Sequence, residues 1–357
     1  MSLRVLIAED SELFVEILTG ILDDEPGIEV VAIADNGADA VDLCEIHRPD
    51  LVLMDIQMPR LDGLSATEEI MSRCPTPILV ITSDPHRDGV DLSFRALSAG
   101  ALDLMAKPEN LAFSADGRAR LLRKMRLLSQ IPVVRHVRAD RRRRQGTPAV
   151  MRHSFAPIAD DAPVAVIGVV GSTGGPKALA NILTALPEGF PAALTIVQHI
   201  SHGFADHLAR WLDDHTRLDV SIASEGQRLR HGQAIIAPTE RHLMVDDALC
   251  LCLTDDPPIG GHRPSGDRLL MSLARNASPR SIGLVLSGMG DDGAAGLTAL
   301  AQAGCPTIAQ DESTSVVYGM PRAAAARGIV EHSLPDTEIA AALVDLVAQM
   351  TPPSRRR

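Results

Sequence analysis

Hydrophobic positions in the first third of the chain follow two alternating patterns. Short and mostly apolar runs occur at Leu3–Ala8, Val30–Ala34, Leu51–Met54, Ile78–Thr82 and Leu102–Met105. Stretches with apolar positions at helical spacing lie between them, at Phe14–Leu22, Ala38–Ile46, Leu64–Met71 and Leu92–Ala99. Short apolar runs are typical of strands buried on both faces of a sheet. Their alternation with helices predicts a parallel sheet that helices cover on both faces.

A second series of the same kind begins near residue 164. The expected strands are Val164–Val170, Ala193–Val197, Ala234–Ala237, Ile282–Leu286 and Pro306–Ala309. The expected helices are Lys177–Leu186, Phe204–Asp214, Arg268–Ala277, Ala294–Ala303 and Glu338–Gln349. We therefore predict an α/β protein with two doubly wound parallel-sheet domains.

A basic segment separates the two series. Residues 118–152 carry 12 basic side chains and one acidic side chain, whereas the whole chain has a formal net charge of −12. A basic helix is expected at 118–131, ended by Pro132, which lacks an N–H and disfavours a helical residue before it. The later prolines and the run Arg141–Arg144 are typical of a linker. We predict domains at residues 1–120 and 163–350, a linker at 121–162 and a frayed tail at 351–357.

Composition limits the classes of function. Aromatic residues make up only 2% of the chain, which argues against stacking platforms for single-stranded nucleic acid. Residues 153–357 carry 15 basic and 22 acidic side chains, which argues against DNA binding. The chain has no apolar run of about 18 residues and no signal-peptide pattern, so we expect a cytoplasmic protein without membrane insertion. Its five cysteines contain no C-x-x-C motif, which predicts reduced thiols.

Acidic side chains gather at the expected strand ends of the first domain. Glu9 and Asp10 follow the first strand, and Asp55 ends the third. Carboxyl ends of parallel strands share one edge, so these carboxylates converge and predict a bound Mg²⁺ unless they are solvated loop acids. Thr82 and Lys107, at the ends of the fourth and fifth strands, are placed to bind phosphoryl oxygens. Asp55 is the expected nucleophile, because a carboxylate can form an acyl phosphate.

A glycine-rich turn, Gly-Ser-Thr-Gly-Gly at 171–175, joins strand to helix at the start of the second domain. It presents Ser172 near the positive end of the helix. A Walker phosphate loop is excluded because Pro176 stands where the glycine before Lys177 is required, and a dinucleotide G-x-G-x-x-G motif is absent. The serine is then a nucleophile or a helix N-cap. The hydrolase pattern G-x-S-x-G is half met, since Val170 replaces its first glycine.

A nucleophilic serine needs a base and an acid that orients the base. His199 follows the neighbouring strand, and Asp291 and Asp292 lie in another glycine-rich turn, where they are also candidate helix caps. Backbone N–H groups near Thr173 and Met289 are candidate oxyanion donors. Other histidines remain rival bases: His202, His207, His231, His242 and His262.

The strand-end residues of the first domain form an ordered set, and on this set residues 1 to about 120 resemble the receiver domain of bacterial response regulators. The resemblance implies a flavodoxin-like fold, phosphorylation of Asp55 and a switch that involves Thr82 and Lys107. Leu104 occupies the position where many receivers have an aromatic switch residue. We therefore expect Thr82 to carry more of the signal.

Further motifs mark the second domain: Gln198-His199, His262-Arg-Pro-Ser, Gly-Met-Gly-Asp-Asp-Gly at 288–293 and Tyr318-Gly-Met-Pro-Arg. With these and the Ser172 turn, residues 163–350 resemble the catalytic domain of the CheB family of protein-glutamate methylesterases. The resemblance implies a Rossmann-like three-layer domain in which Ser172 is the nucleophile, His199 the base and Asp292 the orienting acid. Asp292 is preferred because the family pattern varies at Asp291. Met289 is the implied oxyanion donor.

Together the resemblances imply a phosphorylation-activated enzyme that hydrolyses glutamyl methyl esters on chemoreceptors. The same acyl chemistry also suits deamidation of receptor glutamines. The expected partners are the cytoplasmic region of chemoreceptors and the chemotaxis histidine kinase (CheA) as phosphodonor, and ester hydrolysis needs no cofactor. The alternative is a response regulator with a non-catalytic, partner-binding output domain. Arg141–Arg144 is then a solvated spacer or a segment attracted to acidic receptor tails or anionic membrane.

Overall fold

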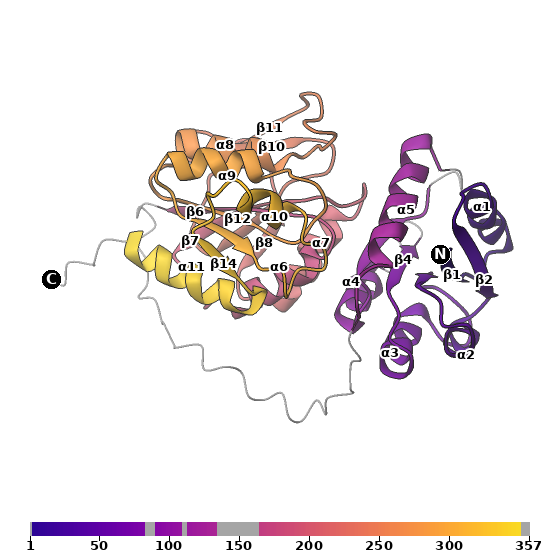
Figure 1. The fold of residues 1–357 in the computed structure, drawn as a ribbon. Coiled ribbons are helices and arrows are strands. Elements are labelled where there is room, and N and C mark those ends of the chain that lie inside the picture. The colour runs from indigo at the N-terminus through magenta and orange to yellow at the C-terminus, as the bar shows by residue number, and fades with distance from the viewer. Residues whose placement is uncertain (1, 83–89, 109–112, 134–163, 351–357) are drawn as a thin grey trace. The chain divides into compact units, whose positions relative to one another are not determined.

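The chain forms two compact units, residues 1–147 and 148–357, each with its own parallel sheet (Figure 1). The structure is a computed structural model, and it describes residues 2–82, 90–108, 113–133 and 164–350. The expected arginine run Arg141–Arg144 and the tail 351–357 lie outside the described residues. None of the helices in the described ranges has the length and hydropathy that a bilayer crossing requires.

The first unit contains a five-stranded parallel sheet in the order β2-β1-β3-β4-β5. Its strands are β1 (Leu3–Ala8), β2 (Ile28–Ala34), β3 (Leu51–Met54), β4 (Ile78–Thr82) and β5 (Asp103–Ala106). Its helices are α1 (Glu12–Asp23), α2 (Gly37–His47), α3 (Gly63–Arg73), α4 (Val90–Ala99) and α5 (Ala115–Leu128). The chain order reverses between β1 and β3, so the carboxyl ends of these two strands flank the crevice where such sheets bind ligands.

The last helix of this unit differs from its expected bounds. α5 begins at Ala115, three residues before the expected start, and the Ser114 hydroxyl caps it by accepting from the Gly117 N–H at 3.1 Å. Leu121, Met125 and Leu128 are buried on one face of the helix. A domain boundary after residue 120 would therefore fall inside a helix that packs into the first unit.

The second unit contains a seven-stranded parallel sheet in the order β14-β13-β12-β6-β7-β9-β8. Its strands are β6 (Ala165–Gly171), β7 (Ala192–Gln198), β8 (Asp219–Ile222), β9 (Gln233–Ile236), β12 (Ser281–Val285), β13 (Thr307–Gln310) and β14 (His332–Leu334). Its helices are α6 (Gly175–Ala185), α7 (Ala205–His215), α8 (Gly266–Asn276), α9 (Ala294–Gln302), α10 (Met320–Ala325) and α11 (Asp336–Met350). Contacts join α8, α9 and α10 on one face of the sheet and α6, α7 and α11 on the other. The order reverses between β6 and β12, which places a second crevice at their carboxyl ends.

An antiparallel hairpin, β10 (His242–Val245) and β11 (Leu251–Thr254), lies outside the parallel sheet and packs against α8. The hydrophobic pattern did not predict this hairpin, nor β8, β14 or α10. The four strands have three or four residues each, which is too few to show a clear alternation of apolar and polar side chains. The hairpin and the start of α8 together form one wall near the second crevice.

Glycines bring α8 close to the sheet. A Cβ at Gly168 in β6 would lie 2.5 Å from Leu270 Cδ2, and one at Gly266 would lie 2.2 Å from Val170 Cγ1. A larger side chain at either position would force these neighbouring side chains to move. The first turn of α8 is therefore held directly against the carboxyl end of β6.

Candidate functional site

Two carboxylates and a lysine meet at the switch point of the first sheet. Glu9 follows β1 and Asp55 follows β3, and both side chains are buried. Lys107 Nζ lies 2.7 Å from Glu9 Oε2 and 2.9 Å from Asp55 Oδ2, and its own side chain is buried. The lysine thus supplies one positive charge between two carboxylates.

The third predicted acid, Asp10, is exposed, and its carboxylate lies within 4.8 Å of ligand oxygens of Glu9 and Asp55. Burial raises the pKa of Asp55, although Lys107 opposes this effect. Burial and then the charge of Asp55 raise the pKa of Glu9 to about 6, again against the effect of Lys107. Hard oxygen ligands crowded in this way, with one open to solvent, fit a Mg²⁺ ion.

Thr82 lies beside Lys107. The Lys107 N–H donates to the Thr82 carbonyl at 2.7 Å, and the Thr82 side chain is buried at the end of β4. Leu104 is buried in β5, where it pairs with Val80 of β4. Ser83, the residue after Thr82, lies outside the described residues.

In the second unit, sheet register brings Ser172 and His199 to the same edge. They directly follow Gly171 and Gln198, which are paired between β6 and β7. The His199 N–H donates to the Gly171 carbonyl at 2.9 Å. The Gln198 amide Nε2 donates to the carbonyls of both Ser172 (2.8 Å) and His199 (3.1 Å), so it ties the two backbones together.

Ser172 is half-buried in a tight turn that leads into α6. Gly174 takes a left-handed conformation with φ of 81° at the N-cap of α6. A Cβ there would also lie 2.6 Å from Val316 Cβ, so glycine is needed for both backbone shape and space. This turn sets the serine at the start of a helix without making it the N-cap residue.

The imidazole of His199 contacts Asp292. Its Nε2 lies 2.8 Å from Asp292 Oδ2, and its Nδ1 is buried without a hydrogen-bond partner. Among the described residues the Ser172 hydroxyl makes no hydrogen bond to the ring. The structure thus brings the predicted base and the predicted acid together, places the serine on the adjacent strand end and leaves one ring nitrogen without a hydrogen bond.

Four donors surround the Asp292 carboxylate, which is buried. The Ser265 hydroxyl and the Asp267 N–H both donate to Oδ1 at 2.9 Å, and the Gly266 N–H donates to Oδ2 at 2.6 Å, beside His199. Burial would raise the pKa of Asp292, but the hydrogen bond and charge of His199 and the backbone donors outweigh it and lower the pKa to about 2. Asp291, the other candidate, is exposed.

Two of the rival histidines, His242 and His262, make contacts that differ from those of His199. His242 is buried, with Nδ1 accepting from the Ser265 N–H at 3.1 Å and Nε2 contacting the Pro257 carbonyl at 3.2 Å. The ring of His262 stacks on that of His199, with centroids 4.0 Å apart and planes within 5°. Of these two, His242 supports the loop before α8, and His262 holds the plane of the His199 ring.

The two predicted oxyanion donors lie on either side of Ser172. Thr173 is buried, and its carbonyl accepts from the Ser287 hydroxyl at 2.7 Å. A Cβ at Gly288 would lie 2.7 Å from Ser172 Cβ, so the chain just before Met289 passes directly beside the serine. Within the described part of the chain, nothing accepts a hydrogen bond from the Met289 N–H.

Sequence reasoning did not identify the roles of Gln198, His242 and Ser265. Gln198 and Ser265 belong to motifs that were noticed, but their contacts join residues 23 to 27 positions apart. Such contacts depend on how α8 and the hairpin pack. The local signal for Gln198 is a long polar side chain that directly follows the apolar run of β7 and precedes His199.

Comparisons with known proteins identify the family of the chain. The family description "CheB methylesterase" matches residues 167–343, and "Response regulator receiver domain" matches residues 5–113. The chain is 44% identical over 344 residues to "Protein-glutamate methylesterase/protein-glutamine glutaminase 2" of Anaeromyxobacter dehalogenans, covering 96% of this chain and 97% of the relative. The chain belongs to the CheB methylesterase family.

Other relatives support the same assignment. A Myxococcus xanthus protein named "Protein-glutamate methylesterase/protein-glutamine glutaminase 3" is 44% identical over 325 residues, covering 90% of this chain and 87% of the relative. The crystal structure of the Thermotoga maritima CheB methylesterase catalytic domain superposes with a TM-score of 0.50 at 34% identity, covering 52% of this chain and 99% of that one. This CheB family member therefore has a receiver followed by a hydrolase, and the non-catalytic alternative is not favoured.

Proposed function

We propose that this CheB family member uses Ser172, His199 and Asp292 to hydrolyse γ-glutamyl methyl esters on the cytoplasmic helices of chemoreceptors. The observation that carries the proposal is the His199–Asp292 contact, with Nδ1 left free beside the Ser172 turn. A buried carboxylate on one ring nitrogen makes the other nitrogen a base. We place the protein in the cytoplasm, where those helices lie.

In the acylation step, Ser172 Oγ attacks the ester carbon and His199 Nδ1 accepts the hydroxyl proton. Asp292 keeps the N–H on Nε2 and stabilises the imidazolium that forms. The Gln198 amide holds the carbonyls of Ser172 and His199, so the two backbones are tied together during this step. The Met289 and Thr173 N–H groups stabilise the oxyanion.

The tetrahedral intermediate then collapses, and His199 returns its proton to the leaving methoxide, which departs as methanol. Water attacks the acyl-serine with His199 again as base, releasing glutamate and restoring the serine. With a glutamine substrate the same steps release ammonia in place of methanol. No step requires a metal or an organic cofactor.

The receiver unit regulates this reaction through Asp55. Glu9, Asp10 and Asp55 would hold Mg²⁺, which would supply positive charge to offset that of the incoming phosphoryl group. Asp55 accepts the phosphoryl group from a chemotaxis histidine kinase, and Lys107 and Thr82 bind its oxygens. Lys107 then gives up part of its contact with Asp55 and binds the phosphoryl group instead. This local change of charge shifts the balance between two conformations of the receiver surface.

A methanol-release assay tests the hydrolase proposal. Full-length protein and its Ser172→Ala and His199→Gln variants are incubated with a chemoreceptor fragment that carries radiolabelled methyl esters. We expect each variant to lose on the order of 10⁴–10⁶ in turnover. Retained activity in Ser172→Ala, with its folding verified by circular dichroism, would remove the serine mechanism.

A further inference from the structure

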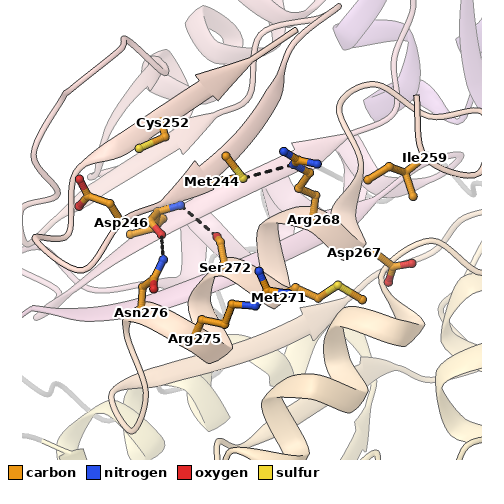
Figure 2. Close-up of a pocket in the computed structure, with 11 residues that line it drawn as sticks. Met244, Asp246, Cys252, Ile259, Asp267, Arg268, Met271, Ser272, Arg275 and Asn276 are labelled. Carbon is orange, nitrogen blue, oxygen red and sulfur yellow. Dashed lines mark hydrogen bonds between the residues drawn. The ribbon is translucent and has the colours of Figure 1, made fainter. Parts of the chain in front are cut away.

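A surface groove of about 350 Å³ separates the β10–β11 hairpin from α8, and Figure 2 shows the side chains that line it. Its apolar lining includes Met244 and Cys252 from the hairpin, Met271 from α8 and Ile259 from the loop between them. Ile259 is 38% exposed, which is unusual for a large aliphatic side chain in this chain. Thioether side chains adapt their shape to varied apolar ligands. None of the catalytic steps above uses this groove.

One end of the groove is built from the elements that hold the catalytic base and acid. Ile259 and His262 exchange two backbone hydrogen bonds, of 3.0 and 2.9 Å, and His262 stacks on the ring of His199. Asp267 also lines the groove, and its N–H donates to the Asp292 carboxylate. A ligand bound in the groove therefore also reaches the surface next to His199 and Asp292.

The groove follows α8 away from that cluster. Asp267 lines one end and Arg275 and Asn276 line the other. At 1.5 Å per residue, the helix from Asp267 to Arg275 spans about 12 Å, or roughly two turns of an α-helix lying alongside. The floor between these ends is rigid, because the Asn276 amide donates to the Val245 carbonyl at 2.8 Å and the Ser272 hydroxyl accepts from the Val245 N–H at 3.0 Å.

The charges along the groove leave a cation available. Asp246 accepts from two backbone N–H groups of the hairpin turn, and Asp267 accepts from the Gly296 N–H at 2.7 Å, so both carboxylates are held in place by the backbone and neither pairs with Arg275. Arg268 pairs with Asp256. Arg275 is exposed, and within the described ranges it forms no ion pair. Arg275 is thus the lining cation that is left to pair with an acidic group of a ligand.

We propose that this groove binds the substrate helix next to the reacting glutamyl side chain. An apolar side chain of that helix packs against Met271 and Ile259, and a glutamate of the same helix pairs with Arg275. Substrate helices carry glutamyl groups by definition, and each hydrolysis adds a carboxylate to them, so they can supply the ion-pair partner that Arg275 lacks. The inference rests on the proposed methylesterase function and adds a determinant of substrate specificity to it.

Binding energy gained along the groove is available to a protein substrate and not to a small ester. The test therefore compares two substrates with the full-length protein: a methylated cytoplasmic fragment of a chemoreceptor, and N-acetylglutamate γ-methyl ester. The variants are Arg275→Glu, its conservative partner Arg275→Lys, and Met271→Asn. Arg217→Glu is the matched control, because this exposed arginine precedes β8 and does not line the groove.

We expect Met271→Asn to raise KM for the receptor fragment about tenfold, as loss of a central contact does. Arg275→Glu reverses the charge at the end of the groove and should raise KM about fivefold. Arg275→Lys and Arg217→Glu should stay within about twofold of wild type. Hydrolysis of the small ester should be unchanged in all four variants. Failure of the wild type to hydrolyse either ester would reject the methylesterase function itself, whatever the groove variants do.

Other outcomes would overturn the groove proposal alone. An unchanged KM for the receptor fragment would show that the substrate does not reach the groove. Equal losses on both esters would show that the variants disturb the catalytic cluster. Faster hydrolysis of the small ester by unphosphorylated variants would point to the receiver as the occupant, and a change in mass by light scattering would point to a second copy of the chain.

Discussion

The two units place a buried aspartate in the same topological position and give it opposite electrostatics. Asp55 and Asp292 both lie beyond the carboxyl end of a strand at the point where the strand order of a parallel sheet reverses. Asp55 shares its site with Glu9 and one lysine, and its pKa is raised by burial. Asp292 is surrounded by donors, and its pKa is lowered to about 2.

The difference shows how one fold class supports two chemistries. The sheet edge determines where polar side chains gather, and their neighbours determine what they do. A carboxylate crowded by other acids is suited to bind a cation and accept a phosphoryl group. A carboxylate held by N–H and O–H donors is a fixed anion, suited to orient an imidazole.

The largest effect on this comparison is expected from replacing Asp292, the predicted acid of the second unit. In Asp292→Asn the geometry stays nearly the same, but the amide no longer favours the N–H on His199 Nε2. We expect turnover to fall by about 10³–10⁴, as in other triads. The matched control is Asp291→Asn, which changes an exposed neighbour and should stay within about twofold. If Asp291→Asn is the damaging change, the assignment of the acid is wrong.

Most of the residues in this comparison could be predicted from the sequence. The strand ends at Glu9, Asp55, Ser172 and His199 followed from alternating apolar runs, because those runs are buried and long enough to show their period. The choice of Asp292 over Asp291 rested on a family pattern, and burial now gives it a physical reason. The His199 ring orientation and its stacking on His262 were not predictable, because they arise from packing between distant segments.

The stability of the two units should respond to acid with opposite sign. The pKa of Asp292 falls from 3.8 to about 2 on folding, so its contribution is present above pH 3.8 and is lost as the pH falls toward 2. That contribution is about 2 kcal/mol. Denaturant unfolding of the second unit between pH 5 and 2.5 should show this loss in wild type and not in Asp292→Asn. If the free energy of unfolding changed with pH in the same way in both proteins, Asp292 would not be the source of this pH dependence.

Glu9 should give the first unit the opposite dependence of stability on pH. Its pKa is raised from 4.5 to about 6, so the folded first unit binds more protons than the unfolded chain in that range. In Mg²⁺-free buffer, the free energy of unfolding of the first unit should therefore decrease as the pH rises from 4.5 to 6. Glu9→Gln should reduce the decrease, and Asp55, whose pKa is also raised, should supply what remains. An increase over this range would show that Lys107 dominates the site.

The receiver site should control turnover without taking part in it. Asp55→Asn removes the phosphoryl acceptor, so we expect it to abolish the rise that a small phosphodonor produces in the wild type. Coupling of this kind is typically on the order of tenfold. Basal methanol release should be unchanged. A variant that still responds to the phosphodonor would place phosphorylation elsewhere.

A smaller effect is expected from one donor on Asp292. Ser265→Ala removes the hydroxyl from Oδ1 but leaves the Asp267 N–H on the same oxygen. We expect kcat to fall about fivefold, equivalent to about 1 kcal/mol, with KM unchanged. Ser272→Ala is the control, because this buried hydroxyl on α8 bonds to the backbone and not to Asp292. Equal effects of the two changes would indicate general loosening of α8.

The central claim is that Ser172 is the nucleophile of the second unit. Its most direct test is to treat the full-length protein with a fluorophosphonate and to locate the adduct by peptide mass spectrometry while following methanol release. The account predicts one phosphonyl group per chain, on Ser172, formed in step with loss of activity and strongly slowed in His199→Gln. Full inactivation with the label on another residue, or full labelling of Ser172 with activity retained, would contradict it.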